Sequence, residues 1–396
     1  MIYFDSAATS YYRPDCVKEA VFQAIGSFGN PSRGAHGACL EADRCMFETR
    51  LLLSGLFNGP GPDRVAFTMN DTQALNTAIL GLGLGKGDHL VVSLQEHNSV
   101  LRPAYLLKSR GVDVRFAGLG IRGTFDPDKF EKILMEIRRE DEDGKLVCAL
   151  AHGSNVTGNV IPLSPVGDLC RRYKAVLILD AAQTAGILPV DMEKDGIDVL
   201  CFSGHKGLMG PQGTGGLIVR RGLEPDSLMT GGSGVRTFLE TMPPEMPARL
   251  EAGTQNSHSI AGLNAALKYA QGKRDSWRKQ EGRLMALFAG GLRELGCETA
   301  SGPEEHAGEN CAVLYGDMDS EVRLPTVSFN LKGYDAGTVA DRLWRERQIA
   351  VRAGGHCAPL IHRFFGTEKR GIVRVSFSHE NTEEQVQILL EEIRKF

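Results

Sequence analysis

Short runs of apolar and β-branched residues recur through the first part of the chain, and helix-length stretches separate several of them. The runs predict seven strands, at residues 65–68, 90–93, 112–117, 146–151, 176–179, 199–203 and 216–219. The stretches between them predict helices at residues 72–82, 101–109, 127–139 and 165–173. This alternation is typical of a largely parallel sheet with helices on both faces.

The second part of the chain has a different pattern. Gly and Pro become frequent from about Arg220, which predicts a long irregular connection before a helix at residues 260–295 that breaks near Gly272. Further strands are predicted at residues 326–330 and 373–377, and further helices at residues 336–346 and 382–393. This mixture indicates a smaller α+β domain that follows the large α/β domain.

Composition and charge narrow the class of protein. Lys and Arg number 45 against 49 Asp and Glu, a formal net charge of −4, which excludes a strongly basic nucleic-acid-binding protein. Hydrophobic residues make up 42% and no apolar run approaches about 18 residues, so no membrane span is expected. The first residues contain no basic segment followed by an apolar stretch, which favours a cytoplasmic location. Nine cysteines without a CxxC pair do not form the pattern of a disulfide framework.

Three local motifs suggest other chemistry and fail on their context. Residues 118–123 match G-x-G-x-x-G, but the next predicted helix is capped later, by Asp126, so its N-terminus would not meet a dinucleotide. Residues 203–206 match S-x-x-K, but the companion motifs of penicillin-binding enzymes are absent. Adjacent His356 and Cys357 would point apart in an extended segment, and no fourth ligand has suitable spacing, so no metal is expected.

Polar clusters follow five of the predicted strands or open the next helix. These clusters are residues 68–72, 96–97, 152–155, 180–183 and 203–206. Because parallel sheets bind ligands outside the carboxyl ends of their strands, we expect the five clusters to meet at one rim. Together they describe a pocket for a phosphorylated, aromatic, electrophilic cofactor, and pyridoxal phosphate has each of these properties.

The reactive end of pyridoxal phosphate would use three of these residues. Its aldehyde needs an amine, which Lys206 would supply, and its ring nitrogen needs an acid that keeps it protonated, which Asp180 would supply. His97 is suited to stack on the ring. Asn155 and Gln183 could bond to the ring hydroxyl.

The phosphate end would use amides and hydroxyls at the start of a helix. The predicted helix after the first strand opens with Asn70, Asp71 and Thr72, and Ser203 and His205 would assist from the other side. The sequence therefore predicts a complete cofactor site, with its phosphate at a helix N-terminus.

The same residues carry a resemblance to a known family. Asp180-x-x-Gln183, followed 23 residues later by Lys206 at the end of Ser-Gly-His-Lys, resembles the class V aminotransferase superfamily of fold type I pyridoxal-phosphate enzymes. The segment Arg-Ala-Gly-Gly-His-Cys-Ala-Pro at residues 352–359 is similar to the active-cysteine segment of second-group cysteine desulfurases, which are related to selenocysteine lyases. The resemblance extends over residues 4–384.

This resemblance implies an architecture. A large cofactor-binding α/β domain with a largely parallel seven-stranded sheet is expected at residues 15–255, and a connecting helix at residues 256–295. Residues 1–14 and 296–396 would form the small α+β domain. Thr254 matches a residue that in the family reaches the partner subunit's phosphate, so a homodimer is implied.

It also implies a reaction, the conversion of L-cysteine to L-alanine with the sulfur left on Cys357 as a persulfide. Lys206 would move protons, His97 would assist, and Arg374 with Asn155 would hold the substrate. Cys357 must act as a thiolate, and His356, Arg352 and Arg374 are the candidate sources of its stabilisation. An acceptor protein or thiol would then take the sulfur.

Several residues depart from the family pattern. Asp71 stands where the family has a small or hydroxyl residue beside the phosphate, Gly355 stands where relatives often have a second His, and Glu380 stands where a Tyr is common. Substrate choice is therefore open. The alternatives are a selenocysteine lyase, a class V aminotransferase or lyase that does not use Cys357, and a cofactor-binding protein without catalysis.

Overall fold

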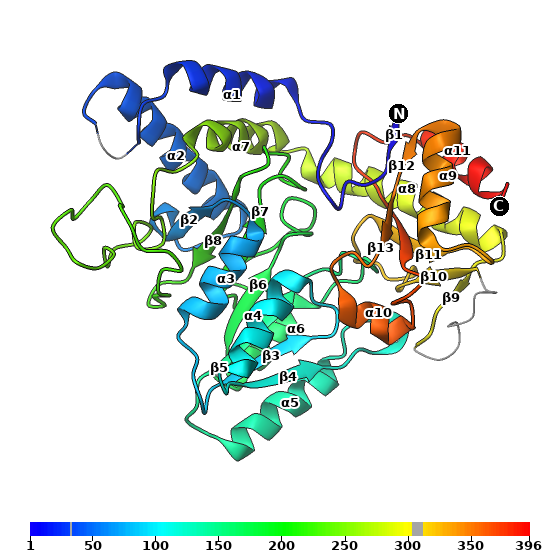
Figure 1. The fold of residues 1–396 in the computed structure, drawn as a ribbon, viewed down its shortest axis with the longest axis horizontal. Helices are drawn as coiled ribbons and strands as arrows, with labels where there is room; N and C mark the ends of the chain where they lie inside the picture. Colours follow the sequence, from blue (N-terminus) through cyan, green and yellow to red (C-terminus); the bar gives the residue numbers. More distant parts are fainter. Residues whose placement is uncertain (32–33, 303–311) are drawn as a thin grey trace.

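The computed structural model describes residues 1–31, 34–302 and 312–396, and its centre is a seven-stranded sheet (Figure 1). Its strands are β2 (Val65–Thr68), β3 (His89–Ser93), β4 (Asp113–Ala117), β5 (Leu146–Ala151), β6 (Val176–Asp180), β7 (Val199–Ser203) and β8 (Gly215–Val219). The order is β2-β8-β7-β6-β5-β3-β4, and β8 is antiparallel to both of its neighbours. The predicted α/β fold with a largely parallel seven-stranded sheet is confirmed.

Helices cover both faces of this sheet because its strands bury side chains on both sides. On one face, Ile178 of β6 packs in a core with α3 (Asp71–Gly81) and α4 (Asn98–Ser109). On the other face, Leu177 and Leu179 pack in a core with four helices. These are α2 (Gly37–Leu56), α5 (Pro127–Glu140), α6 (Leu163–Arg172) and α7 (Ser257–Ala270). Helix α1 (Asp15–Ser27) packs against α7 at the edge of the molecule (Figure 1).

A second sheet lies at the other end of the molecule, in the order β13-β14-β11-β10-β9. Its strands are β9 (Glu298–Thr299), β10 (Val313–Tyr315), β11 (Thr326–Asn330), β13 (Arg352–Gly354) and β14 (Ile372–Ser376). Helices α8 (Arg274–Glu294), α9 (Ala336–Arg347), α10 (Pro359–Phe365) and α11 (Glu383–Ile393) accompany it. The predicted break near Gly272 is confirmed, because this glycine has a φ of 71° between α7 and α8.

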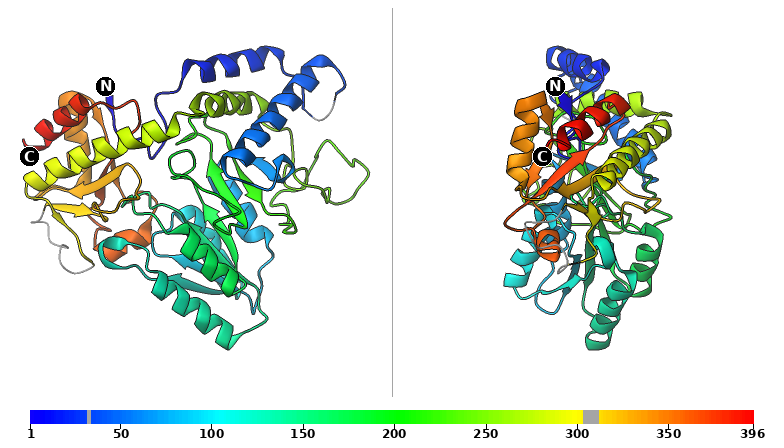
Figure 2. Two further views of the ribbon diagram at one scale, coloured as in Figure 1. Left: turned by 180° about the vertical axis from the view of Figure 1, so that it is seen from behind. Right: turned by 90° about the vertical axis from the view of Figure 1, so that its right-hand side faces the viewer.

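Both chain ends lie with this second sheet, as the two further views show (Figure 2). Strand β1 (Ile2–Tyr3) pairs in parallel with β12 (Ile349–Ala350), and Asp5 forms a bridge with Ser376 of β14. The N-terminal segment is therefore attached to elements more than 300 positions later in the chain. The three-part domain division stays a prediction.

The structure agrees with the interpretation that the G-x-G-x-x-G match at residues 118–123 is not a dinucleotide site. Asp126 caps α5 by accepting hydrogen bonds from two backbone N–H groups, so the glycines of residues 118–123 precede the helix and do not open it. Among the described residues, the cysteines are all free. No described helix is both long enough and apolar enough to cross a membrane. Helices α1 and α2 are not among the elements predicted from the sequence.

The strand directions place the predicted polar clusters at one rim of the large sheet. Strands β3, β5, β6 and β7 end there, and the antiparallel β8 begins there with Gly215. The start of α3 lies directly over this glycine. A Cβ atom on Gly215 would lie 2.7 Å from the backbone carbonyl carbon of Asn70. A glycine is therefore required for this close approach.

Candidate active site

A pocket lies at this rim. Ten of the eleven residues predicted to bind the cofactor line it: Asn70, Asp71, Thr72, His97, Asn155, Asp180, Gln183, Ser203, His205 and Lys206. Thr254, the remaining one, is exposed just before α7 and does not line this pocket. Gln95 and Ser99 also line it and were not predicted.

Lys206 and Asp180 reach the pocket from adjacent strands. Asp180 is the last residue of β6, and Lys206 follows the end of β7. Burial lowers the pKa of the Lys206 amine, whereas the negative charge of the Asp180 carboxylate acts in the opposite direction. Asp180 is buried, and its Oδ1 accepts a hydrogen bond of 2.8 Å from the backbone N–H of Ala182. An amine and an acid thus line one cavity.

The start of α3 forms one end of the pocket. Asn70 caps this helix by accepting the backbone N–H of Gln73 at 2.9 Å. The N–H groups of the first turn then face a site that favours anions. His205 also lines the pocket, and its Nδ1 lies 2.9 Å from Thr9 Oγ1. This end has the arrangement expected of a phosphate site.

His97 is the N-cap of α4, and its ring is neutral. Its Nδ1 accepts the backbone N–H of Ser99 at 3.1 Å and also lies 2.9 Å from Ser99 Oγ. Ser99 Oγ in turn lies 2.8 Å from Thr72 Oγ1. Burial, with a smaller contribution from the charge of Lys206, lowers the pKa of His97 to about 4. The ring is therefore held as an uncharged, oriented surface.

Buried polar atoms without partners indicate that the pocket is built for a polar ligand. Among the described residues, three such atoms belong to side chains that line it: Asp71 Oδ1, Gln95 Oε1 and Ser203 Oγ. Unpaired buried groups of this kind cost free energy unless a ligand or water satisfies them. The Ser203 hydroxyl and the N-terminus of α3 suit a phosphate group. The amine of Lys206 suits an aldehyde, and the acid of Asp180 suits a protonated ring nitrogen, so the residues present fit pyridoxal phosphate.

Cys357 lies outside this pocket, in an adjoining surface groove. The groove is lined by Asn98, Arg352, Ala353, Gly355, His356, Cys357, Ala358, Pro359, His362, Arg363 and Glu368. Cys357 is exposed, and its backbone carbonyl accepts the N–H of Asn98 at 2.7 Å. His356 and Cys357 have φ angles of 48° and 56°, so two consecutive residues are in the left-handed region. A tight turn therefore presents the thiol to the surface.

The environment of His356 bears on how the thiolate of Cys357 could be stabilised. Burial, followed by the charge of Arg374, lowers the pKa of His356 to about 3. Its Nε2 lies 2.9 Å from the carbonyl of Ile372 and donates to it. The imidazole is therefore neutral near pH 7, so it would not supply a positive charge to Cys357, and its part in stabilising the thiolate stays a prediction. Arg352, which lines the same groove, remains as a cation.

Asn155 connects the pocket to the cysteine turn and to Arg374. Its side-chain amide donates to the His356 carbonyl at 2.7 Å, and its own carbonyl accepts Arg374 Nη1 at 2.9 Å. Arg374 is 2% exposed and also donates through Nη2 to Asp5 Oδ1 at 2.7 Å. Arg374 is therefore not among the residues that line the pocket. It pairs with Asp5, which was not predicted as a site residue.

Comparisons with known proteins agree with this geometry. The family model described as Aminotransferase class-V matches residues 2–389. The chain belongs to the class V aminotransferase family. The probable cysteine desulfurase of Methanothermobacter thermautotrophicus is 34% identical over 99% of this chain and 94% of its own length. That of Pyrococcus abyssi is 33% identical over 98% of this chain and 92% of its own length.

Solved structures of the family have the same fold. The apo cysteine desulfurase from Thermococcus onnurineus NA1 has a TM-score of 0.88 and 30% identity, and the match covers all of this chain and 94% of that one. The Escherichia coli cysteine desulfurase CsdA, in its S-sulfonic acid form, has a TM-score of 0.81 and 27% identity over 99% of this chain and 94% of that one. The predicted membership of the desulfurase branch of this class V family is confirmed.

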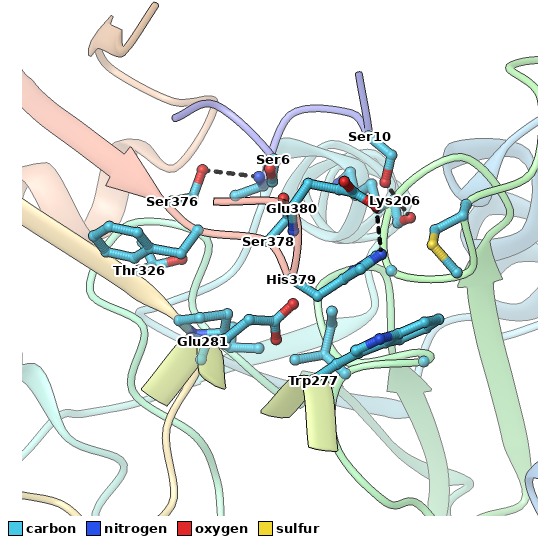
Figure 3. Close-up of a pocket in the computed structure, with 18 of the residues that line it drawn as sticks. Ser6, Ser10, Lys206, Trp277, Glu281, Thr326, Ser376, Ser378, His379 and Glu380 are labelled. Atoms are coloured by element: carbon cyan, nitrogen blue, oxygen red, sulfur yellow. Dashed lines mark hydrogen bonds and ion pairs between the residues drawn. The ribbon is translucent and has the colours of Figure 1, made fainter. Parts of the chain in front are cut away.

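A second cavity lies against α8, and Lys206 lines both this cavity and the candidate active-site pocket (Figure 3). Glu281 projects into it from α8, and burial raises the pKa of this carboxyl to about 8. Trp277 stacks on His379, with 4.0 Å between ring centroids. Glu380, which stands where relatives often have Tyr, pairs with His379 at 3.3 Å. No sequence motif indicated this cavity, because its residues come from distant segments.

Proposed function

We propose that this chain is a pyridoxal-phosphate-dependent cysteine desulfurase that converts L-cysteine to L-alanine and leaves the sulfur on Cys357 as a persulfide. The observation that carries the proposal is that Lys206 and Asp180 line the same pocket, next to a groove that exposes Cys357. The family match and the desulfurase relatives support it.

The cofactor supplies an electron sink for a carbanion at the substrate's α-carbon. Lys206 would hold its aldehyde and Asp180 its ring nitrogen, while His97 would cover one face of the ring. Asn70, Thr72, Ser203 and His205 would hold the phosphate, and Gln183 with Asn155 would border the ring oxygen. Thr254 is assigned to the phosphate of the partner subunit in a homodimer.

Lys206 is the proposed acid and base of the reaction. Burial lowers the pKa of its amine, so its neutral form is more accessible at neutral pH than that of an exposed lysine. The amine removes the proton from the substrate's α-carbon and returns a proton to the carbon that loses sulfur. His97, neutral and fixed by Ser99, excludes water from the ring face.

Arg374 and Asn155 are proposed to hold the substrate carboxylate. The Nε of Arg374 is buried without a partner among the described residues, so this guanidinium still has a donor to offer. Its two Nη atoms are held by Asp5 and by the Asn155 carbonyl. This fixation orients the guanidinium plane before substrate arrives.

Sulfur transfer requires the Cys357 thiolate. Its sulfur attacks the substrate sulfur, an S–S bond forms, and the C–S bond breaks with its electron pair left on the carbon that becomes the alanine methyl group. Because the thiol lies in the groove and not in the pocket, the turn at residues 356–357 must bring it past Asn155. The persulfide then returns to the surface, where an acceptor protein or thiol takes the sulfur. A cytoplasmic location is proposed with this reducing chemistry.

The test of this proposal is the ratio of alanine to sulfide that the protein produces. The protein, loaded with pyridoxal phosphate, is supplied with L-cysteine and dithiothreitol, and alanine and sulfide are quantified. The proposal predicts a 1:1 ratio for wild type and for the control Cys16→Ser, and loss of sulfide production in Cys357→Ser. Sulfide release by Cys357→Ser at the wild-type rate, or formation of a keto acid, would contradict it.

Selenocysteine is the alternative substrate, because selenium in place of sulfur would use the same residues. Competition between cysteine and selenocysteine for the same enzyme distinguishes a desulfurase from a selenocysteine lyase. Independently, Lys206→Ala should lose the visible absorbance of the bound cofactor.

A further inference from the structure

Asp71, one of the departures from the family pattern, is the first residue of α3. The start of this helix packs closely against β8. A Cβ on Gly215 would lie only 3.0 Å from the backbone nitrogen of Asp71. Asp71 is 8% exposed, and its Oδ1 has no hydrogen-bond partner among the described residues. The backbone thus forces this acid into the interior of the pocket.

The carboxyl group that Asp71 meets there is that of Asp180. Both side chains line the pocket, and a hydrogen bond between their carboxyl groups raises the pKa of Asp71 and opposes the rise that burial causes in the pKa of Asp180. Ionised carboxylates only accept hydrogen bonds, so one member of this pair must carry a proton. Among the described residues, the other titratable groups that interact with Asp71 or Asp180 are Lys206, the buried thiol of Cys201 on β7 and the buried carboxyl of Glu96.

The proton belongs on Asp71. Burial and then the negative charge of Asp180 raise the pKa of Asp71 well above its ordinary value. Asp180 receives a second hydrogen bond, from the backbone N–H of Ala182 at 2.8 Å, which stabilises its ionised form. The unpaired oxygen of Asp71 is much less costly on a neutral acid than on a carboxylate.

We propose that Asp71 is a positioning residue whose protonated carboxyl donates a hydrogen bond to Asp180 and keeps Asp180 ionised against the ring nitrogen of the cofactor. The inference rests on the proposed function, because the ring is that of pyridoxal phosphate. It moves Asp71 from the phosphate end, where the sequence suggested it, to the ring-nitrogen end. No proton is transferred; it stays on Asp71.

The consequence concerns the proton on the ring nitrogen. Without the donor, Asp180 becomes more basic and competes with the ring nitrogen for that proton. Hydrogen bonds to charged groups are strong enough that the ratio of ring-bound to Asp180-bound proton should fall by about 10- to 100-fold. The electron sink of the cofactor weakens in the same proportion as its protonated form is lost.

Three variants separate this role from a general structural one. Asp71→Asn keeps a neutral hydrogen-bond donor of nearly the same shape, whereas Asp71→Ala removes the donor. Asp128→Ala is the matched control, because Asp128 is an exposed acid in the first turn of α5. The first measurement is the ¹⁵N chemical shift of pyridoxal phosphate labelled at the ring nitrogen and bound to each protein at neutral pH.

The proposal predicts that this signal moves toward the unprotonated value in Asp71→Ala only. Wild-type, Asp71→Asn and Asp128→Ala proteins should give the same shift. An unchanged signal in Asp71→Ala overturns the proposal. Equal displacement in Asp71→Asn and Asp71→Ala also overturns it, because that result would mean that Asp71 acts through a negative charge.

The second measurement needs no cofactor. The infrared difference spectrum between cofactor-free wild type and Asp71→Asn should contain the C=O stretching band of a protonated carboxyl group in the wild type. Absence of this band overturns the assignment of the proton to Asp71. If the wild type does not bind pyridoxal phosphate at all, the proposed function fails, while the infrared result still decides whether Asp71 carries the proton.

Discussion

The ion pair between Asp5 and Arg374 should be a main attachment of the N-terminal segment. Its Nη2 to Oδ1 distance is 2.7 Å, and the two side chains are 19% and 2% exposed. The pair connects a residue beside β1 to the middle of β14. Removing the acid leaves the guanidinium buried, with the Asn155 carbonyl as its remaining partner in the described part of the chain.

The expected cost of Asp5→Ala follows from that burial. Breaking a buried ion pair by removal of one partner costs about 3–5 kcal/mol. The partial exposure of Asp5 places the expected value near the lower end, about 3 kcal/mol, or roughly a 150-fold change in the unfolding equilibrium. Since Arg374 is also the proposed carboxylate clamp, the KM for cysteine should rise together with this loss of stability.

Urea unfolding provides the measurement, with Asp15→Ala as the matched control. Asp15 pairs with Lys18 at 2.8 Å, but the two side chains are 84% and 68% exposed, and such surface pairs contribute about 0–1 kcal/mol. The variant that combines Asp5→Ala with Arg374→Met should recover stability relative to Asp5→Ala alone, since no unpaired charge remains. If Asp5→Ala and Asp15→Ala lower the midpoint equally, the reasoning from burial is refuted.

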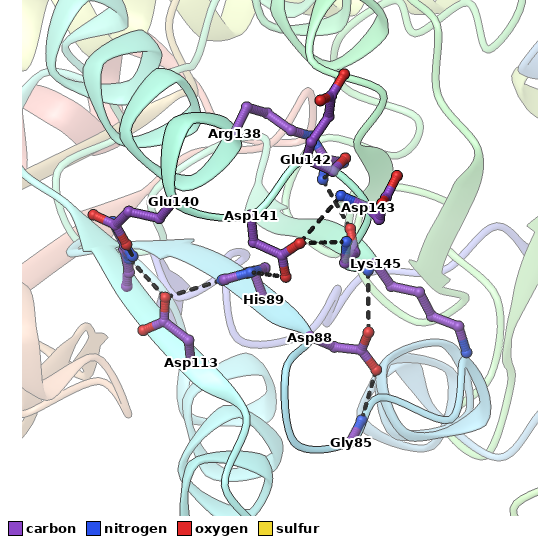
Figure 4. Close-up of polar contacts among 12 residues, drawn as sticks. Gly85, Asp88, His89, Asp113, Arg138, Glu140, Asp141, Glu142, Asp143 and Lys145 are labelled. Carbon is purple, nitrogen blue, oxygen red and sulfur yellow. Dashed lines mark hydrogen bonds and ion pairs between the residues drawn. The ribbon is translucent and has the colours of Figure 1, made fainter.

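Two further predictions concern packing and pH. Gly215→Ala should destabilise the protein by about 1–3 kcal/mol and weaken cofactor binding, because the new Cβ would meet the backbone of α3. Gly26→Ala is the control: no atom lies within 4 Å of its Cβ, so thermal melts should find it neutral or stabilising. Hydrogen bonds from the Gly144 backbone and from His89 hold the pKa of Asp141 below its ordinary 3.8 (Figure 4). The ionised Asp141 therefore stabilises the folded protein fully above pH 3.8, and this contribution is lost as the pH falls through the lower pKa of the folded state. Asp141→Asn should therefore lose less stability on acidification than wild type does in acid-unfolding curves; parallel curves would contradict this.

The strands of the large sheet were predictable because a central strand buries both faces. Residues 146–151 are apolar throughout, and all of β5 is buried. The reversed direction of β8 was not predictable, since a short apolar run has no direction. Helices α1 and α2 lack the usual signals: neither N-cap, Pro14 or His36, accepts a capping hydrogen bond from the helix backbone through its side chain.

The candidate site was predictable where its residues follow strands and unpredictable where it depends on distant contacts. The ends of parallel strands must share one rim, so Asp180 and Lys206 were expected together. Asp5 joins the site through the pairing of β1 with β12, which no local motif encodes. The neutrality of His356 depends on its burial, and the direction of Asp71 depends on the close approach at Gly215.

The position of β8 between β2 and β7 has a consequence for synthesis of the chain. Val65 of β2 pairs with Ile218 of β8, and the separation is 218 − 65 = 153 positions. At roughly 5–20 residues per second, a ribosome needs about 8–30 seconds to supply that partner. During this interval β2, whose four residues are all buried in the finished protein, has no strand to pair with. Nascent chains that stall before residue 218 should therefore be bound by chaperones that recognise apolar segments, and release should coincide with the emergence of β8.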